Sequence, residues 1–504
     1  MSDLLTSPGL PAARLGATRL ERAVAAALSR LGLHEARRQA GVAVLCRAEE
    51  AFAIRAASAR AAGRTLDLQY YVWRGDTTGK LLGREALAAA DRGVTVRMLL
   101  DDVYALGHER TLAALDTHPN IEVRLFNGTQ WRRFGRWGYL LEFAFGGWHL
   151  NRRMHNKNWI ADRALAVVGG RNIGDEYFGL DIDGAISFRD LDLVVAGTPA
   201  AQALAVFERY WNSPLSRPAS LLSAASEARG GLAALRVAME EAARMPQAAG
   251  LVATLAEHPA RRIRHGLTAV APDAVRVVAD APEKAKRGLG ARKRARAAGG
   301  IAAEIADALR EAKREARLIS PYFVPGRAGL KLLLELVARG VKVSVVTNSL
   351  AATDVVAVHG GYMKYRRPLL RAGVTIHELK PDLEQERASL VGSRGGAALH
   401  TKALVVDGLR AFVGSFNMDH RSASLNTEMG VFVQNPVVAR EVAAEQERLT
   451  DPAISWKVSL EQGRIVWRDT HQGVPRTSHT EPEASWRRTA VAFLARVLPV
   501  EEQL

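Results

Sequence analysis

Two stretches of the chain decide its fold: residues 155–172 read HNKNWIADRALAVVGGRN, and residues 400–417 read HTKALVVDGLRAFVGSFN. Both carry histidine, lysine, aspartate and asparagine at the same spacing, with a Gly-Gly or Gly-Ser pair before the asparagine. Packing explains the apolar residues between them, but a core has no need of the repeated polar types. The repeat therefore indicates chemistry performed by two matched copies of one motif.

Each copy is expected to fold as two strands joined by a turn. His155 and Lys157 are two residues apart, so on a strand their side chains leave the same face. We expect strands over 156–161 and 164–168, followed by a helix start at 171–173. The second copy predicts strands over 403–406 and 411–413 in the same arrangement.

The duplication extends beyond the motifs. Arg92-Gly93-Val94 is echoed by Arg339-Gly340-Val341. Helical patterns over 49–62 and 301–316 each precede an expected strand, over 66–72 and 318–324. The chain is thus predicted to be an α/β protein of two halves related by a pseudo-twofold axis, with the active site at their junction. The expected divisions are an N-terminal helical segment over 1–40, a first domain over 41–211, a helical linker over 212–273, a second domain over 274–440 and a C-terminal region over 441–504.

Composition and charge limit the classes of partner. The chain has 504 residues, of which 48% are hydrophobic, enough for more than one core. Lysine and arginine outnumber aspartate and glutamate by 69 to 53, a net charge of +16, so attraction to polyanions such as anionic lipid or nucleic acid is expected. The one cysteine, Cys46, rules out an internal disulfide and fits a reducing cytosol, and equally a cysteine-poor protein of the periplasm. No stretch reaches the roughly 20 apolar residues that span a bilayer, so any membrane contact is expected to be peripheral.

Two histidines suit the cleavage of a phosphodiester. One imidazole attacks phosphorus while the other, protonated, donates to the leaving oxygen and later takes a proton from the incoming hydroxyl. Lys157 and Lys402 would supply positive charge to the phosphate oxygens, with Asn172 and Asn417 as further donors. We expect no metal and no cofactor, because no Asp/His cluster has ligand-like spacing and the lysines already neutralise the phosphate.

Each histidine needs an acceptor that holds its far ring nitrogen. Two carboxylates, Asp190 and Glu428, each begin an apolar stretch at a matching place after the motifs. We assign Asp190 to His155 and Glu428 to His400 as orienting residues, with Asp192 as the fallback.

Three further residues are candidates. Asp162 and Asp407 complete the motifs and are counted with the catalytic residues, but each would face away from its lysine on an unbroken strand. They are expected to support the motif through hydrogen bonds or ion pairs rather than to touch the substrate. His359 follows the expected strand end at 347–348 and either reaches a headgroup or serves as a structural histidine; the sequence favours neither.

The doubled motif resembles the signature of the phospholipase D superfamily. Stretches 66–73, 169–178, 319–326 and 347–354 are similar to the bacterial cardiolipin synthases of the C type, and the resemblance covers most of the chain. It implies two phospholipase D-like α/β sandwich domains, with His155 as the nucleophile that forms a phosphohistidine and His400 as the acid and base. It also implies phospholipid substrates and a peripheral place on the cytoplasmic face of the inner membrane.

Three segments bear on the choice between lipid and nucleic acid. Residues 131–148 hold seven aromatics and three interleaved arginines, which suits a bilayer interface and equally a helix packed on its own domain. Residues 486–498 predict a short helix with Trp486, Phe493 and Leu494 on one face, which can lie in the plane of a membrane interface. The basic stretch 284–296 predicts a solvated linker, with attraction to anionic headgroups as the alternative.

By the resemblance, the expected enzyme is a cardiolipin synthase that passes a phosphatidyl group from phosphatidylglycerol or phosphatidylethanolamine to phosphatidylglycerol. The alternatives are a phospholipase D-type hydrolase that releases phosphatidic acid and a superfamily nuclease that acts on nucleic acid. Superfamily nucleases look like short single-motif chains, and the tyrosyl-DNA enzymes lack the motif aspartate. Both points disfavour nucleic acid as a partner. A non-enzymatic scaffold is disfavoured because neither motif has lost a catalytic residue type.

Overall fold

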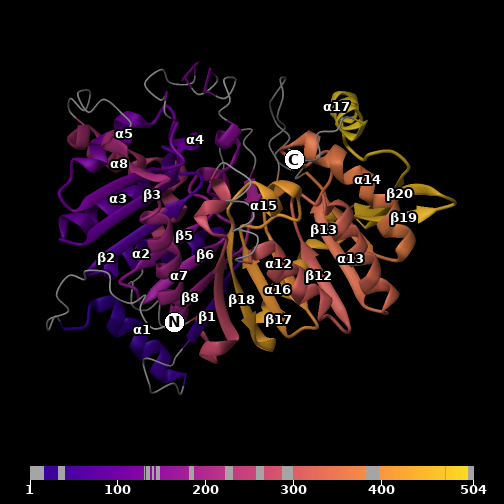
Figure 1. Ribbon diagram of the computed structural model, residues 1–504, viewed down its shortest axis with the longest axis horizontal. Coiled ribbons are helices and arrows are strands. Elements are labelled where there is room, and N and C mark those ends of the chain that lie inside the picture. The colour runs from indigo at the N-terminus through magenta and orange to yellow at the C-terminus, as the bar shows by residue number, and fades with distance from the viewer. Residues whose placement is uncertain are drawn as a thin grey trace.

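The computed structural model describes residues 16–497 except 32–39, 130, 132–136, 139–140, 143–147, 181–186, 222–230, 257–265, 287–298, 382–396 and 472. Two large mixed sheets lie side by side, one in each half of the chain, and their inner strands meet at the centre (Figure 1). The prediction of an α/β protein with two related halves is confirmed.

The first sheet has nine strands in the order β10-β1-β8-β6-β5-β2-β3-β4-β9. Strands β2, β3 and β4 run parallel to one another, and the remaining pairs are antiparallel. The strands are β1 Ala40–Leu45, β2 Thr65–Tyr70, β3 Thr95–Asp101, β4 Ile121–Phe126, β5 Asn158–Ala161, β6 Leu165–Gly169, β8 Asp192–Gly197, β9 Ser216–Pro218 and β10 Thr268–Val270. Strands β9 and β10 come from the segment 212–273, which therefore extends the first sheet as well as holding helices.

The second sheet repeats eight strands of the first in the same order. Its order is β11-β18-β17-β16-β12-β13-β14-β19-β20-β21, and the eight strands from β11 to β19 correspond in order to those from β1 to β9. The parallel trio β12, β13 and β14 stands where β2, β3 and β4 stand in the first sheet. The strands are β11 Val275–Ala279, β12 Glu315–Ile319, β13 Lys342–Asn348, β14 Thr375–Leu379, β16 Ala403–Val406, β17 Arg410–Gly414, β18 Met429–Gln434, β19 Ser455–Glu461, β20 Arg464–His471 and β21 Val474–Ser478.

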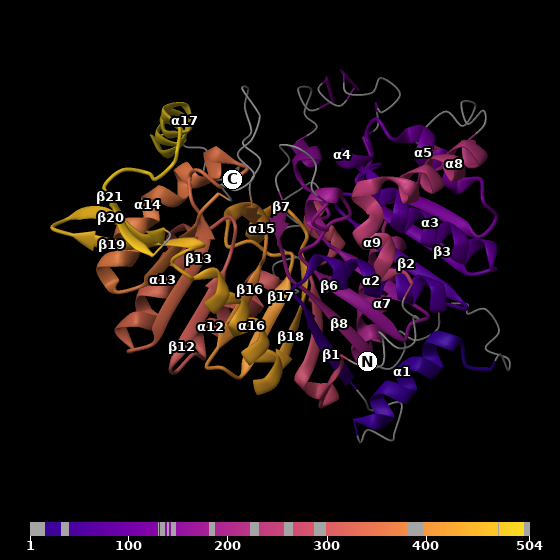
Figure 2. The same ribbon diagram turned by 180° about the vertical axis from the view of Figure 1, so that it is seen from behind.

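Helices cover both sheets, as Figures 1 and 2 show from opposite sides. The α-helices are α1 Arg19–Arg30, α2 Ala48–Ala61, α3 Thr77–Asp91, α4 Asp102–Ala105, α5 Glu109–Asp116, α7 Thr198–Trp211, α8 Gly231–Arg244, α9 Ala249–Thr254, α12 Ile301–Arg310, α13 Gly326–Ala338, α14 Val356–Ala372, α15 His420–Ser424, α16 Pro436–Leu449 and α17 Trp486–Val497. Short 3-10 turns are η3 Trp148–Asn151, η4 Asp175–Tyr177, η5 Ala219–Leu221, η7 Pro246–Ala248, η8 Pro272–Ala274 and η9 Pro282–Ala285. The helix start expected at 171–173 comes a few residues later, as η4.

The two halves interlock at their junction. Helix α7 of the first half contacts β11 of the second, and α16 of the second contacts β1 of the first. A two-stranded parallel sheet joins β7 Ser187–Arg189 to β15 Ala397–Leu399 across the junction. One hydrophobic cluster contains buried residues of both halves, including Ile160 and Val413. Because the halves share a core, side chains at the junction are held by both.

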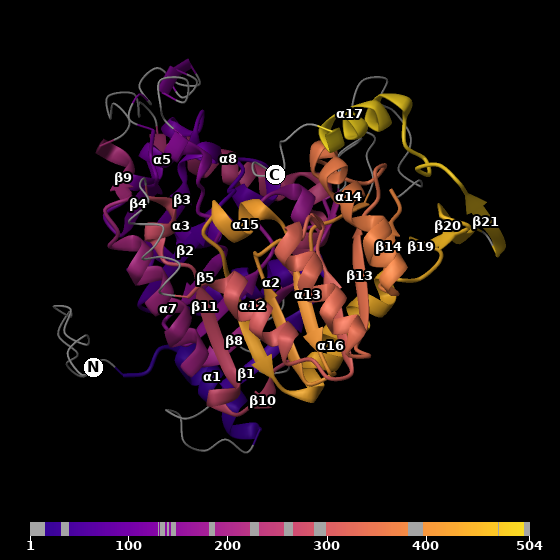
Figure 3. The ribbon, with the colours of Figure 1, turned by 45° about the vertical axis from the view of Figure 1, so that its right-hand side comes forward.

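The C-terminal helix α17 forms over Trp486–Val497 and packs on α14, at the end of the molecule opposite α1 (Figure 3). Among the described residues, no helix is both long enough and apolar enough to cross a bilayer. Most of the aromatic segment 131–148 and of the basic stretch 284–296 lies outside the described residues.

Candidate active site

Each motif histidine is fastened to the opposite half of the molecule. The backbone N–H of His155 donates to the carbonyl of Thr427 at 2.8 Å, just before β18. The backbone N–H of His400 donates to the carbonyl of Arg189, also at 2.8 Å, just before β8. Both histidines therefore lie at the junction, where strands β6 and β8 of the first sheet approach β17 and β18 of the second.

The carboxylates expected to orient the histidines do so, but with exchanged partners. Nδ1 of His155 lies 2.8 Å from a carboxylate oxygen of Glu428, and Nδ1 of His400 lies 2.5 Å from one of Asp190. The assignment of Asp190 to His155 and of Glu428 to His400 was therefore wrong. The physical reason is the backbone fastening, which sets the residue after Thr427 beside His155 and the residue after Arg189 beside His400.

The fallback carboxylate, Asp192, is committed elsewhere. It is fully buried, and one of its oxygens lies 2.9 Å from Arg55 and 3.3 Å from Arg171. Asp192 thus forms ion pairs with two buried guanidinium groups and does not orient a histidine.

Small residues after the second motif strand make room for the carboxylates. A Cβ on Gly170 would lie 2.2 Å from an oxygen of Asp190, so only glycine fits without a shift. In the second motif Ser415 takes this place, and its hydroxyl donates to the Glu428 carboxylate at 2.5 Å. The Gly-Gly and Gly-Ser pairs therefore serve the close approach of the orienting carboxylates.

Burial favours the neutral form of both imidazoles in the resting site. Burial lowers the pKa of His155 to about 4 despite the carboxylate of Glu428. Burial and the ammonium groups of Lys402 and Lys157 lower the pKa of His400 well below its usual 6.5. A neutral ring that donates Nδ1–H to a carboxylate carries its lone pair on Nε2. Each Nε2 is thus ready either to attack or to accept a proton.

The motif lysines are buried beside the rings. Nζ of Lys157 donates to the carbonyl of His155 at 2.7 Å, and Nζ of Lys402 donates to the carbonyl of His400. Burial lowers the pKa of Lys402 to about 8 and that of Lys157 well below its usual 10.5. The backbone of each motif therefore aims its own ammonium group into the site.

Aromatic rings, which the sequence arguments did not single out, line both histidines. The ring centroid of Tyr71 lies 5.0 Å from that of His155, and its ring lies 5.3 Å from Nζ of Lys157. Tyr177 and Phe188 each lie 5.1 Å from the ring of His400. Tyr71 and Tyr177 fall inside two stretches that support the family resemblance, which was the only sequence signal for them.

The two motif asparagines differ in their bonding. The side-chain oxygen of Asn172 accepts from the Val72 N–H at 3.2 Å, and its amide donates to the Tyr177 hydroxyl at 3.0 Å. Asn172 therefore positions the ring beside His400, and phosphate binding by its second amide hydrogen remains a prediction. The side-chain oxygen of Asn417 is buried without a hydrogen-bond partner. Phosphate binding by Asn417 remains a prediction.

Asp162 lies at the far end of its hairpin from the histidine. Its carboxylate accepts the backbone N–H groups of Gly63, Arg64 and Thr65 at 2.9, 2.8 and 3.0 Å, just where β2 begins. Tyr71, which touches His155, follows the other end of β2. Counting Asp162 with the catalytic residues was wrong, whereas a supporting role through hydrogen bonds agrees with the structure.

Asp407 repeats this arrangement in the second half. Its carboxylate accepts the N–H groups of Lys313, Arg314 and Glu315 at 3.0, 2.7 and 2.9 Å. Asp407 has a φ of +55°, and Asp162 has a φ of +50°. The residue after each aspartate also has a positive φ, so both central residues of each turn are left-handed, as in a type I′ turn. The motif aspartates therefore form the turn and bind it to the start of the neighbouring strand in the sheet, β2 or β12. Asp407 is thus not catalytic either.

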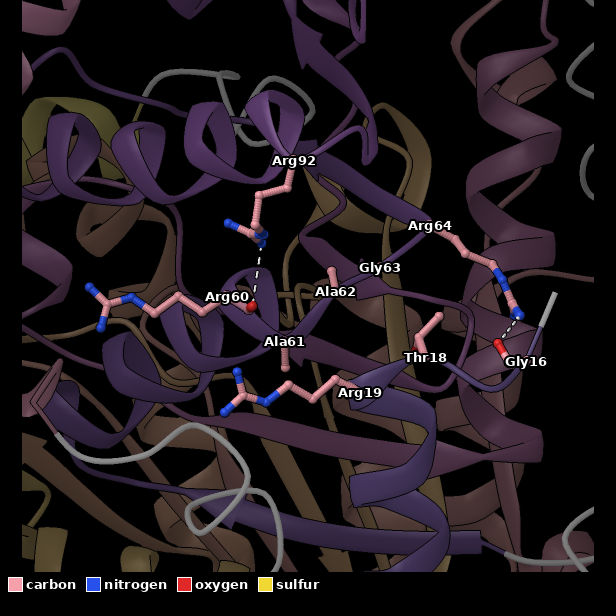
Figure 4. A pocket seen from close by; sticks show the side chains of 9 residues that line it. All are labelled: Gly16, Thr18, Arg19, Arg60, Ala61, Ala62, Gly63, Arg64 and Arg92. Atoms are coloured by element: carbon pink, nitrogen blue, oxygen red, sulfur yellow. Dashed lines mark hydrogen bonds between the residues drawn. The ribbon is translucent and has the colours of Figure 1, made fainter.

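Arginines surround both aspartate turns. Two cavities of about 460 and 770 Å³ lie there, away from the histidines (Figure 4 shows the first). The first is lined by Arg19, Arg60, Arg64 and Arg92, and the second by Arg310, Arg314, Arg339 and Arg410. Arg60 is paired with Glu85 and Arg64 with Glu21, both at 2.6 Å, so these guanidinium groups are already neutralised. We assign no chemistry to either cavity.

His359 lies in a separate buried cluster. Its ring is 3.6 Å from the carboxylate of Glu481 and 3.4 Å from the guanidinium of Arg366. The same arginine lies 3.3 Å from the buried Glu378. The structure therefore gives His359 a packing role between α14 and the segment before α17, and a headgroup contact is not supported. Among the described residues, no three His, Cys, Asp or Glu side chains gather as a metal site requires.

Comparison with known proteins agrees with this geometry. The family described as "Cardiolipin synthase, PLD-like domain" matches residues 56–211 and 305–450, one match in each half. Cardiolipin synthase C of Escherichia coli (strain K12) is 38% identical over 92% of this chain and 96% of its own. An uncharacterized protein of Helicobacter pylori (strain J99) is 31% identical over 88% of this chain and 85% of its own. The solved phosphatidylserine synthase of Haemophilus influenzae Rd KW20 shares the fold, with a TM-score of 0.56 at 14% identity over 94% of this chain and 100% of its own.

Proposed function

Because the chain belongs to the cardiolipin synthase family of phospholipase D-like proteins, we propose that it transfers a phosphatidyl group to phosphatidylglycerol through a phosphohistidine. As a member of this family it is a phosphatidyltransferase of the phospholipase D superfamily. The observation that carries the proposal is that each motif histidine is paired with a carboxylate of the opposite half. These two pairs join the imidazoles of both halves into one site. The donor lipid is phosphatidylglycerol or phosphatidylethanolamine.

In the first step Nε2 of His155 attacks the phosphorus of the donor lipid. The new N–P bond forms as the bond from phosphorus to the headgroup oxygen breaks, and protonated His400 donates its proton to that oxygen. The carboxylate of Glu428 favours His155 as the nucleophile, because the pKa of Glu428 is lowered by the neighbouring His155 and Lys157 even though burial opposes this. An ionised Glu428 compensates the positive charge that develops on the phosphorylated ring.

In the second step the acceptor hydroxyl of phosphatidylglycerol attacks the same phosphorus. His400, now neutral, takes the hydroxyl proton, the N–P bond breaks and His155 is regenerated. With phosphatidylglycerol as both donor and acceptor, the products are cardiolipin and glycerol. Burial raises the pKa of Asp190, the partner of His400, which suits a pair that gains and loses a proton in each turnover.

The charges of the site explain how a buried histidine becomes protonated. Two ammonium groups, of Lys157 and Lys402, face two carboxylates, of Asp190 and Glu428, so the resting charges nearly cancel. A phosphodiester adds one negative charge to these surroundings, and a proton on His400 restores the balance. A nearby anion raises a histidine pKa, so substrate binding and protonation support each other.

We extend the proposal to the surface on which the enzyme works. A phospholipid donor and acceptor both lie in a membrane, and the net charge of +16 favours an anionic one. We propose a peripheral enzyme on the cytoplasmic face of the inner membrane. A partner protein is not required by any step above.

The test is to incubate purified protein with phosphatidylglycerol vesicles, with and without phosphatidylethanolamine, and to separate the lipids. Diphosphatidyl product supports the proposal. Phosphatidic acid alone would make the protein a hydrolase, and DNA cleavage without lipid turnover would overturn the proposal. His155→Ala and His400→Ala should each abolish cardiolipin formation.

A leaving-group experiment tests the assignment of the two histidines. A phosphatidyl ester of p-nitrophenol needs little help from an acid, because its leaving group is a stable phenolate. His400→Ala should therefore still release nitrophenol once per enzyme molecule and leave a phosphatidyl adduct on the peptide that contains His155. His155→Ala should form no adduct. An adduct on His400 would reverse the assignment.

A further inference from the structure

The C-terminal helix α17 leaves its largest apolar side chains uncovered. The apolar stripe consists of Trp486, Ala490, Phe493, Leu494 and Val497. Trp486 is 75% exposed, and Phe493 and Leu494 are each 59% exposed. At about 100° per residue the five positions share one side of the helix. The sequence predicted this grouping, and the structure shows that neither half of the described molecule covers the apolar stripe.

Close packing on the other side fixes the rotation of the helix. Ala492 and Ala495 are its buried residues, and both face α14. A Cβ on Gly360 of α14 would lie 2.4 Å from the carbonyl oxygen of Ala492 and 2.9 Å from Cβ of Ala495. Only small residues fit this contact. A turn of α17 that buried Trp486 or Phe493 against α14 would create a clash, so the exposure of the apolar stripe is built into the packing.

An arginine gives a second restraint on the same side. The Arg488 guanidinium donates to the carbonyl of Leu350 at 2.9 Å and to the carbonyl of Thr353. Both acceptors lie in the loop that follows β13. Helix α17 is thus held on the end of the parallel strands rather than on the side of the sheet.

The restrained helix is linked to the catalytic centre through two residues. Asn348, the last residue of β13, exchanges two hydrogen bonds with the backbone of Leu399, at 2.9 and 3.0 Å. Leu399 directly precedes His400. The chain of contacts from α17 through the loop 349–353 to His400 places the apolar stripe at the active-site end of the molecule.

Both halves present exposed aromatics at this end. Figures 1 and 2 show α4 of the first half and α17 of the second at the same end of the molecule. Tyr104 on α4 and Trp131 are each 41% exposed. Trp131 lies close to α4, because Thr129 donates two hydrogen bonds to Asp102 of that helix, at 2.8 and 2.7 Å.

Charge identifies the partner as a lipid surface. Arg487 and Arg496 are exposed on either side of the apolar stripe, and the Arg487 guanidinium lies 5.5 Å from the ring of Trp486. Aromatic rings beside cationic side chains suit the headgroup layer of an anionic bilayer. A second copy of the chain fits less well, because pairing two stripes would bring four arginines together on molecules that each carry a net charge of +16.

We propose that the apolar stripe of α17 inserts into the headgroup layer of an anionic bilayer and seats the active-site end of the enzyme on its lipid substrates. The proposal rests on the proposed function for the identity of those substrates. At 12 residues α17 is too short to cross the bilayer, so it would lie in the interface plane.

The test compares two variants that lose exposed apolar side chains. The stripe variant is Trp486→Ser, Phe493→Ser and Leu494→Ser, and the control is Val237→Ser with Val474→Ser, which lie on α8 and β21 and are 57% and 62% exposed. Co-sedimentation with vesicles of phosphatidylglycerol and phosphatidylcholine measures binding. Gel filtration measures self-association.

The stripe variant should bind the vesicles at least tenfold more weakly than wild type, and its cardiolipin synthesis on vesicles should fall in parallel. Its synthesis from short-chain phosphatidylglycerol below the micelle concentration should stay within twofold of wild type. The control should match wild type throughout. Unchanged vesicle binding by the stripe variant would overturn the proposal. So would a stripe variant that loses self-association on gel filtration but still binds vesicles.

If the stripe variant folds poorly, a labelling experiment still tests whether the apolar stripe inserts into the bilayer. In a Cys46→Ser background, a polarity-sensitive dye on Phe493→Cys should shift to the blue on vesicles and be quenched by brominated lipids, and a dye on Val474→Cys should not. Equal responses at the two sites would contradict the proposal. If wild type binds through the stripe but makes cardiolipin from neither lipid form, the proposed function fails and the membrane contact stands.

Discussion

Replacing Asp162 with alanine should destabilise the protein and leave its chemistry intact. The carboxylate is 3% exposed and accepts three backbone N–H bonds of 2.8 to 3.0 Å from residues 63–65. No contact joins it to either motif histidine, whose ring partners are Glu428 and Asp190. Loss of Asp162 should therefore lower the stability of the folded protein without changing its catalytic groups.

The expected loss follows from these bonds. Each hydrogen bond to a charged group contributes about 1.5–3 kcal/mol, but the three share one carboxylate, and water can reach part of the loop at 63–65. Alanine at a φ of +50° adds about 1 kcal/mol of backbone strain. We therefore expect a loss of about 3–5 kcal/mol in the free energy of unfolding, within the range of the severest single substitutions. Because the two halves share a core, the 504 residues are expected to unfold together, and the melting temperature should fall by roughly 3–5 °C.

The assay pairs thermal unfolding, followed by circular dichroism, with cardiolipin synthesis at 15 °C, where the variant is still folded. Asp162→Asn should lose about half as much stability, because asparagine tolerates the positive φ and keeps one acceptor oxygen. Asp407→Ala should also lose less, since that carboxylate is more exposed. His155→Ala is the reverse control, with no turnover. The reasoning is refuted if Asp162→Ala melts like wild type and yet loses its turnover.

Three further substitutions probe the site. Gly170→Ala should lower turnover at least 100-fold with small change in vesicle binding, because its Cβ would lie 2.2 Å from a carboxylate oxygen of Asp190; full activity would contradict that close approach. Glu428→Gln should lower kcat about 10³ to 10⁴-fold by removing the anion behind His155, as loss of an orienting carboxylate does in a catalytic triad, and near-normal kcat would count against the cross-half pairing. Wild-type kcat/KM should fall as pH rises through about 8, where Lys402 loses its proton, and this alkaline limb should shift to higher pH in Lys402→Arg, whose charge persists. An unmoved limb would exclude Lys402 as its source.

Local features were predictable because they depend on residues close together in the chain. The strands expected over 403–406 and 411–413 correspond to β16 and β17, and the helix expected over 49–62 corresponds to α2. In each of these elements the apolar residues recur at the period of a strand or a helix, and no tertiary contact overrides that local preference. The helix expected over 301–316 ends at Arg310, because residues from 315 onwards pair with β13 as strand β12. The turn between helix and strand, residues 311–314, contains neither glycine nor proline to mark the end of the helix in the sequence.

The residue types of the site were also visible in the sequence, but not every role. Asp190 and Glu428 were found from their matched places after the motifs. The role of Tyr177 was not, since its contact with His400 depends on η4, a turn that periodicity does not predict. Asp162 and Asp407 belong to the same repeated motif as the catalytic residues yet act at the other end of the hairpin, because four residues of extended chain separate each aspartate from its lysine.

The order of residues along the chain determined by itself that two copies of one motif exist, that each makes a hairpin and that α17 has one apolar side. Only the tertiary structure decided which carboxylate meets which histidine. In a duplicated chain, pairing within a half and pairing across halves satisfy the same local pattern, so spacing cannot distinguish them. The choice was made by the hydrogen bonds from His155 to Thr427 and from His400 to Arg189, which form only when the two halves pack together.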